Sequence, residues 1–254
     1  MSRQLVADDA VSIVDALRGC WENLPLLLLQ SVVCCLGFIM VVFALPGLTP
    51  VSVLIGVALL APVFASIVHT ALRIIDGDDP RVREWLLSFS RAWRNSLGQA
   101  LCCGVAVSLL LVALLALGSS AQPWLYVPVV VAASVSVILA LCLPIVFALS
   151  SDLSMNVGQR IDPAKLADGE KRVVDSTLSG VEKWLLACHL LARRPIPFLA
   201  VAALAVLGIW LAANVSAALM LLVPVPVALV AALAYRTALV QLNIQKTPTV
   251  GAAR

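Results

Sequence analysis

Residues 23–72 read NLPLLLLQSVVCCLGFIMVVFALPGLTPVSVLIGVALLAPVFASIVHTAL, fifty residues without one Asp, Glu, Lys or Arg. A helix that crosses the hydrocarbon core of a bilayer needs about 20 apolar residues, so this stretch has room for two spans. Leu45-Pro46-Gly47-Leu48-Thr49-Pro50 divides it near the middle. Proline lacks the amide donor and glycine is flexible, so we expect the helix to end there and reverse. The stretch therefore predicts a helical hairpin in lipid.

Two later stretches repeat this design. Residues 95–151 carry no charge and are interrupted at 117–123, and residues 195–235 carry none and are interrupted at 214–216. Three hairpins predict an all-α polytopic membrane protein with six transmembrane helices. The six expected spans cover residues 24–45, 51–75, 96–117, 123–149, 195–213 and 217–240.

The composition agrees with one membrane domain over residues 1–245. The chain is 62% hydrophobic and only 12% charged, whereas soluble domains are about a quarter charged. A helical insertion at 152–194 is expected on the cytoplasmic side, and residues 246–254 are expected to form a flexible tail. The segment at 152–194 is small for an independent soluble domain, so we expect it to pack on the membrane part.

The placement of the 17 Lys and Arg residues predicts the orientation. Two precede the first hairpin, five separate the first from the second, seven separate the second from the third, and three follow the third. The turns on the opposite side have none. Cytoplasmic loops carry the excess of Lys and Arg, so both termini and both long connections are expected inside. The predicted location is a multi-pass position in the plasma membrane.

Cytoplasmic helices beside the spans are the candidate working surfaces. Asp79 is expected to cap a helix that begins at Pro80. Apolar residues then recur at helical spacing, and cations accompany them. Such helices suit either anionic lipid in the inner leaflet or a docked protein partner, and both interpretations stay open. The apolar stripe is Val82, Trp85, Leu86, Phe89 and Trp93, and the candidate contact residues are Arg81, Arg83, Arg91, Arg94, Arg193 and Arg194.

A weak internal repeat also links the hairpins. Arg18-Gly19-Cys20-Trp21-Glu22-Asn23 before the first span resembles Ser90-Arg91-Ala92-Trp93-Arg94-Asn95 before the third. Proline interrupts the even-numbered spans, which predicts kinked helices at a central contact. A general likeness among membrane hairpins explains the repeat equally well. The candidate structural residues are Asn23, Asn95, Pro62 and Pro144.

The sequence lacks the common motifs of catalytic and metal-binding sites. The sequence has no phosphate-loop, nucleophile-elbow or zinc-helix motif. Cys34-Cys35 and Cys102-Cys103 do not have metal-ligand spacing. His69 lies near a span end, where hydrogen bonding is a simpler role than proton coupling. We therefore expect no catalytic, cofactor-binding or metal site and no nucleic-acid partner.

Several segments of the first hairpin and the residues after it form a recognisable pattern. They are Ala61-Pro62-Val63-Phe64-Ala65-Ser66-Ile67, Ala71-Leu72-Arg73 and Gly77-Asp78-Asp79. In this pattern the chain resembles the YesL-like family, integral membrane proteins of unknown function (domain of unknown function 624). Leu143-Pro144-Ile145 and Arg193-x-Pro195 also resemble the family. The sequence departs from it at Ala61, where the family has Gly, and in a longer segment before that position. The family has no established catalytic residues, so none is implied here.

This resemblance implies a non-enzymatic accessory membrane protein associated with carbohydrate uptake. Its expected partners are membrane lipid and subunits of an ABC-type importer. An alternative is a permease-type subunit of an ABC transporter. Asp162-Pro163-Ala164-Lys165-Leu166-Ala167-Asp168-Gly169 resembles the coupling helix of such permeases, with altered spacing and no Glu.

Overall fold

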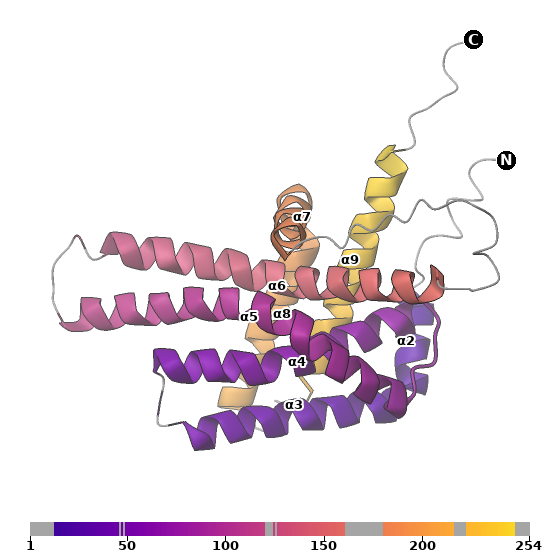
Figure 1. The fold of residues 1–254 in the computed structure, drawn as a ribbon, viewed down its shortest axis with the longest axis horizontal. Coiled ribbons are helices and arrows are strands. Elements are labelled where there is room, and N and C mark those ends of the chain that lie inside the picture. Colours follow the sequence, from indigo (N-terminus) through magenta and orange to yellow (C-terminus); the bar gives the residue numbers. More distant parts are fainter. Residues whose placement is uncertain are drawn as a thin grey trace, which may run out of the picture.

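The computed structural model describes residues 13–45, 47, 49–119, 124, 126–160, 180–215 and 222–246. In this part of the chain every regular element is a helix, so the all-α prediction is confirmed. The helices, labelled in Figure 1, are α2 (Ile13–Glu22), α3 (Leu24–Ala44), α4 (Pro50–Ile75), α5 (Val82–Ser119), α6 (Tyr126–Arg160), α7 (Gly180–Arg193), α8 (Pro195–Asn214) and α9 (Pro224–Lys246).

Five helices are long and apolar enough to cross a membrane, which agrees with a multi-pass membrane protein. They are α3, α4, α8, the Ser96–Gly118 part of α5 and the Tyr126–Asp152 part of α6. The sixth expected span was placed at 217–240. There, Leu222 and Val223 are not helical, α9 begins only at Pro224, and its apolar part is shorter, Pro224–Leu239. The six-span topology therefore stays a prediction.

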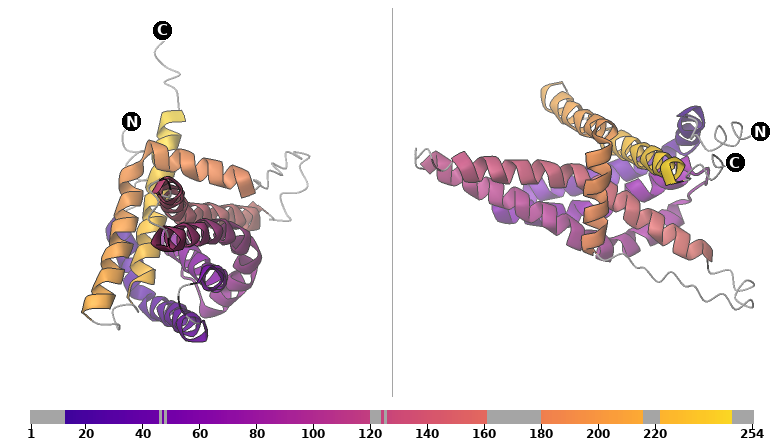
Figure 2. Two further views of the ribbon diagram at one scale, coloured as in Figure 1. Left: turned by 90° about the vertical axis from the view of Figure 1, so that its left-hand side faces the viewer. Right: turned by 90° about the horizontal axis from the view of Figure 1, so that it is seen from above.

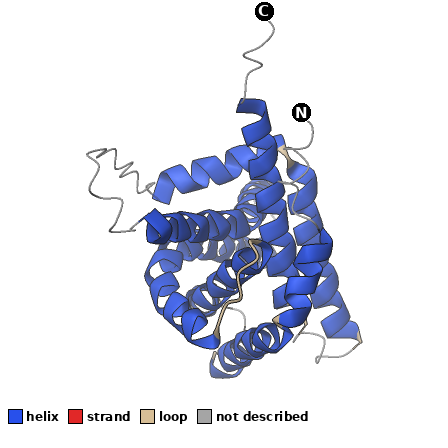
Figure 3. Ribbon diagram, turned by 90° about the vertical axis from the view of Figure 1, so that its right-hand side faces the viewer, coloured by secondary structure: helices blue, strands red, loops and turns tan. Residues whose placement is uncertain are grey.

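The long helices form two groups with different directions. Helices α3, α4, α5 and α6 run alongside one another, each contacting the next in the chain. The α8–α9 pair runs across this group, as Figures 1 and 2 show from different sides. Figure 3 gives the same arrangement from the opposite end, with α8 and α9 side by side. The core of the molecule lies where α9 meets the group of four.

Helix α4 is the centre of the packing. It contacts α2, α3, α5, α6 and α9, and half of its span is buried, against 28% for α3 and 11% for α8. The C-terminal half of α4 supplies Ile67, Val68, Ala71 and Leu72, all fully buried. Lipid is as apolar as these side chains, so close van der Waals packing, rather than removal from water, holds such helices together.

Helix α5 corrects one boundary and joins two predicted elements. It begins at Val82, not Pro80, so Asp79 does not cap it. Its 38 residues correspond to about 57 Å, well beyond the roughly 30 Å hydrocarbon core. The expected separate cytoplasmic helix is thus the first part of α5, here called the α5 extension (82–95). It curves away from the line of the bundle (Figures 1 and 2).

Three other boundaries either differ from the expected positions or lie outside the described residues. Helix α6 continues to Arg160, so the predicted insertion at 152–194 begins inside a helix. Within the insertion, α7 forms as expected, while residues 161–179 lie outside the described part of the chain. Lys246 is the last residue of α9, and the tail at 247–254 lies outside the described residues.

The two similar stretches at 18–23 and 90–95 have different structures. Asn23 lies at the break between α2 and α3, where both its backbone N–H and its side-chain amide donate to the Gly19 carbonyl at 3.1 Å. Asn95 lies within the continuous α5, and its side chain is not among those described. Pro62 is fully buried inside α4 and Pro144 is half-buried inside α6. Pro224, in contrast, begins α9 rather than interrupting it.

Candidate functional site

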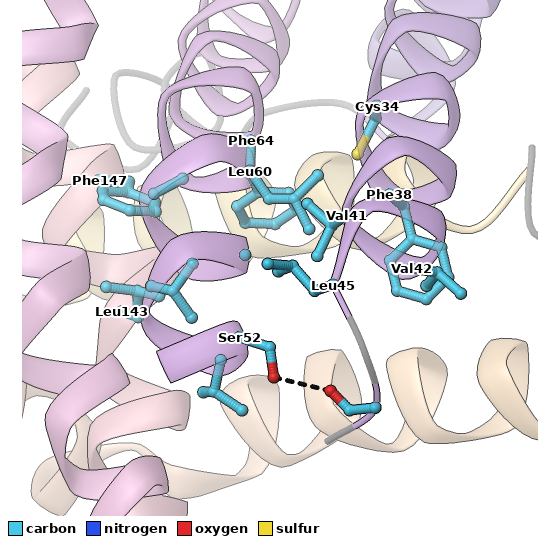
Figure 4. A pocket seen from close by; sticks show the side chains of 15 residues that line it. Cys34, Phe38, Val41, Val42, Leu45, Ser52, Leu60, Phe64, Leu143 and Phe147 are labelled. Atoms are coloured by element: carbon cyan, nitrogen blue, oxygen red, sulfur yellow. Dashed lines mark hydrogen bonds between the residues drawn. The ribbon is translucent and has the colours of Figure 1, made fainter. Parts of the chain in front are cut away.

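An apolar cavity of about 760 Å³ lies between α3 and α4 (Figure 4). Residues of α6 close one side, with Phe147 near Phe64 of α4 at a ring-centroid distance of 6.3 Å. Its volume falls within the roughly 300–1,000 Å³ of small-molecule sites. The lining is Cys34, Phe38, Val41, Val42, Leu45, Gly47, Ser52, Val53, Gly56, Val57, Leu60, Ala61, Phe64, Leu143 and Phe147.

The turn between α3 and α4 forms one end of the cavity. Gly47 has a φ of +79°, which a side-chain-bearing residue rarely adopts, so glycine suits this reversal. Thr49 caps α4, with its hydroxyl accepting from the Ser52 N–H at 3.1 Å. The Ser52 hydroxyl lies 2.8 Å from the Gly47 carbonyl as donor. These bonds hold the hairpin end in one shape.

Two glycines set how closely the cavity walls approach. A Cβ added at Gly56 would lie 3.1 Å from Val41, and one added at Gly37 would lie 3.3 Å from Leu60. Both contacts join α3 to α4. The two helices therefore meet closely at these points and leave the open volume beside them.

A second polar feature lies at the other end of α4 and ties three helices together. Arg236 of α9 bonds Asp76, which ends α4, and lies 3.1 Å from the Asp152 carboxylate of α6. The Tyr235 hydroxyl donates to Asp152 at 3.2 Å. Because only about a fifth of the Arg236 side chain is exposed, solvent screens these pairs incompletely.

Burial raises the pKa of the Asp76 carboxyl, and the hydrogen bond from Arg236 opposes that shift. The guanidinium thus favours the ionised form of a carboxylate whose pKa burial raises. We call Asp76, Asp152, Tyr235 and Arg236 the α4–α6–α9 clamp.

A neighbouring arginine fixes the start of α5. Arg73 of α4 donates to Asp78 at 3.3 Å and to Glu84 of the α5 extension. The hydrogen bond from Arg73 lowers the pKa of Glu84. Stability from this pair is therefore present above the ordinary Glu pKa and is lost as the pH falls through the lowered value. The pair holds the α5 extension against α4.

A buried chain of side-chain hydrogen bonds crosses α3, α4 and α5. The Trp85 indole N–H donates to the Ser66 hydroxyl at 3.1 Å, and the Thr70 hydroxyl donates to the Ser66 carbonyl at 3.0 Å. The Gln30 amide donates to Thr70 at 2.9 Å. These bonds satisfy the Trp85, Thr70 and Gln30 donors and favour the helix faces that bring them together. The Gln30 Oε1 atom is buried without a hydrogen-bond partner among the described residues.

The structure places the six predicted arginines in different surroundings. Arg81 and Arg83 are exposed at the start of α5, and Arg193 and Arg194 are exposed where α7 gives way to α8. Arg91 and Arg94 belong to α5, but their side chains are not among those described. No interaction that the structure describes brings the two groups of arginines together. They belong to two separate segments, the start of α5 and the junction of α7 with α8.

Sequence reasoning missed the clamp and the cavity. Asp152 and Arg236 are the first charged residues after two of the charge-free stretches, and Asp76 follows Arg73 just after the first stretch. Opposite charges at these three ends are a signal that could have suggested pairing. The cavity has no comparable signal, because its lining residues are ordinary for a span.

Comparison with protein-family models, curated proteins and solved structures finds no match to this chain.

Proposed function

We propose that this chain is a non-enzymatic accessory protein of the membrane, which docks a partner through the α5 extension. The carbohydrate part of the proposal, association with a sugar importer of the ABC type, comes from the resemblance to the YesL-like family. The plasma membrane and cytoplasmic termini come from the distribution of Lys and Arg.

The observation that carries the proposal is that one face of the α5 extension packs against the bundle while the opposite face is exposed and apolar. One side is fixed: Trp85 is 5% exposed and bonds Ser66, and Glu84 bonds Arg73. The other side is open, with Leu86 and Leu87 each about 55% exposed. An anchored helix with a free apolar face and nearby cations suits a protein partner, because binding need not first order the helix.

Lipid headgroups are the other surroundings that such a helix could meet. A lipid contact depends on summed charge, at about 1 kcal/mol per basic residue. A protein contact depends on position, since arginine forms directional, bidentate pairs. Substitution of arginine by lysine, which keeps the charge but removes bidentate pairing, can therefore distinguish a protein contact from a lipid contact.

The test is affinity purification of the full chain in mild detergent, with co-purifying subunits identified by mass spectrometry. We expect importer subunits to accompany the native chain. Leu86→Ala with Leu87→Ala should abolish their recovery. The matched control is Leu28→Ala with Leu29→Ala in α3, which are similarly exposed but belong to a membrane span.

Arg91→Lys with Arg94→Lys provides the second arm. Weaker association with normal membrane insertion supports a docked protein. Full association in this double variant, with loss only on removal of both charges, would favour lipid and remove the proposed contact. If no importer subunit co-purifies with the native chain, the proposed association with a sugar importer is wrong.

A further inference from the structure

We propose that the cavity between α3 and α4 binds one acyl chain of a membrane amphiphile. The polar end of that amphiphile would lie at the α3–α4 turn and its chain would extend toward the middle of the bilayer. This site goes beyond the proposed docking role and needs no protein partner.

The length of the cavity matches one leaflet. Its walls extend from Leu45 back to Cys34 on α3 and from Ser52 to Phe64 on α4. At 1.5 Å per helical residue, both walls are about 17 Å long. The hydrocarbon core is about 30 Å thick, so this corresponds to roughly half of it. A chain that enters at the turn would thus reach the region where the two leaflets meet.

The walls of the cavity approach each other closely. An added Cβ at Gly37 would lie 3.3 Å from Leu60, and one at Gly56 would lie 3.1 Å from Val41, so α3 and α4 have little room to move closer or to rearrange at these points. A partner helix inserted between the walls would have to separate these contacts, whereas a flexible hydrocarbon chain can follow the space that is already open.

The chemistry of the lining divides into a long apolar part and a short polar end. Carbon side chains from three helices form the walls, as Figure 4 shows. The polar groups lie at the turn, where the Ser52 hydroxyl and Gly47 carbonyl bond each other. No charged residue occurs between 45 and 52. The site should therefore select the chain and discriminate little between headgroups.

The test uses the full chain in detergent with a palmitic acid that carries a photoactivatable diazirine near mid-chain. Adducts are mapped by mass spectrometry after irradiation. We expect saturable labelling, concentrated on residues 34–45 of α3 and 52–64 of α4. Unlabelled palmitic acid and uncharged palmityl alcohol should compete equally well.

Two variants fill the cavity from opposite walls, so that one misfolded protein does not decide the result. Val53→Trp acts from α4, and Val42→Trp acts from α3, where Val42 is 55% exposed and can accept a larger side chain. Each should weaken saturable labelling about tenfold or more. Ile55→Trp is the control, because Ile55 is exposed on α4 and does not line the cavity.

Three outcomes would overturn the proposal. One is labelling spread evenly over lipid-facing residues such as Leu36 and Ile39, which indicates only surrounding lipid. Another is undiminished labelling in both filled variants while they remain folded. The third comes from a photo-crosslinking amino acid at position 42 in native membranes, if it captures a polypeptide instead of lipid. None of these readouts depends on the importer subunits sought above.

Discussion

Arg236 joins three helices through its guanidinium group. It faces two carboxylates, Asp76 and Asp152, from two other helices. If the guanidinium is removed, both carboxylates lose a partner at a site where solvent is restricted. Breaking such a pair leaves uncompensated charge, which costs more than the pair contributes when intact.

Arg236→Gln should therefore lower the free energy of unfolding by about 1–3 kcal/mol, less than for a fully buried pair because the site is partly exposed. Arg194→Gln is the control: that side chain is exposed, and the change should stay within about 0.5 kcal/mol. Thermal or denaturant unfolding of the purified proteins in detergent gives the measurement. Equal stability of the two variants would show that the clamp holds nothing together.

The sequence predicted the positions of the charged residues only in part. It indicated that charge gathers at the ends of spans, but not which charges meet. Arg73 and Arg236 are paired, whereas Arg81 and Arg83 are exposed, and periodicity treats all four alike. Pairing depends on how α4, α6 and α9 approach one another, which no local pattern contains.

At the scale of elements, the hydrogen bond between Trp85 and Ser66 and the ion pair between Glu84 and Arg73 help to position the α5 extension. The buried bond between Trp85 and Ser66 is the more informative of the two, because it joins helix faces without depending on salt. The predicted stripe divides accordingly: Trp85 packs inward, whereas Val82 and Leu86 are about half exposed.

A double-mutant cycle measures this connection. Ser66→Ala and Trp85→Phe should each destabilise the protein, and together they should cost less than the sum, with a coupling of about 1 kcal/mol. Limited proteolysis near residues 76–81 should accelerate in each single variant, since that connection precedes the extension. Strict additivity in the cycle would mean that the two side chains stabilise the fold independently.

The elements themselves were largely readable from the sequence. The bounds of α3 and α4 and the start of α8 at Pro195 agree closely with the expectation. Proline and glycine at these positions favour the start or the end of a helix. The starts of α5 and α9 were less predictable. A proline at the first helical position is only a preference, and at Pro80 the ion pair and the packing of Trp85 place the helix start two residues later.

At the scale of the whole molecule, the direction of the α8–α9 pair is the feature that the sequence did not suggest. Three similar charge-free stretches predict three similar hairpins, yet this pair runs across the other four long helices (Figures 1 and 3). Most of α8 is open to its surroundings, including Ile196, Val206 and Trp210. Hydropathy gives the length of a span but not its tilt, which packing decides.

Reporter insertions test the topology. Insertions near Gly47 and Ser216 should read as external, and insertions near Asp79 and Gly169 should read as internal. The decisive position is Ser216, between α8 and α9. An internal reading there, with Gly47 external and Gly169 internal, would show that α8 does not cross the bilayer. An external reading at Gly169 would overturn the whole orientation.

The clamp also has a consequence for biogenesis. Asp76 and Arg236 lie 160 residues apart in the chain, and translation proceeds at about 5–20 residues per second. Both carboxylates are therefore delivered to the membrane many seconds before the cation that neutralises them. A chain truncated before α9 keeps this imbalance permanently. Completion of α9 is thus the step of synthesis at which the two carboxylates gain their cation.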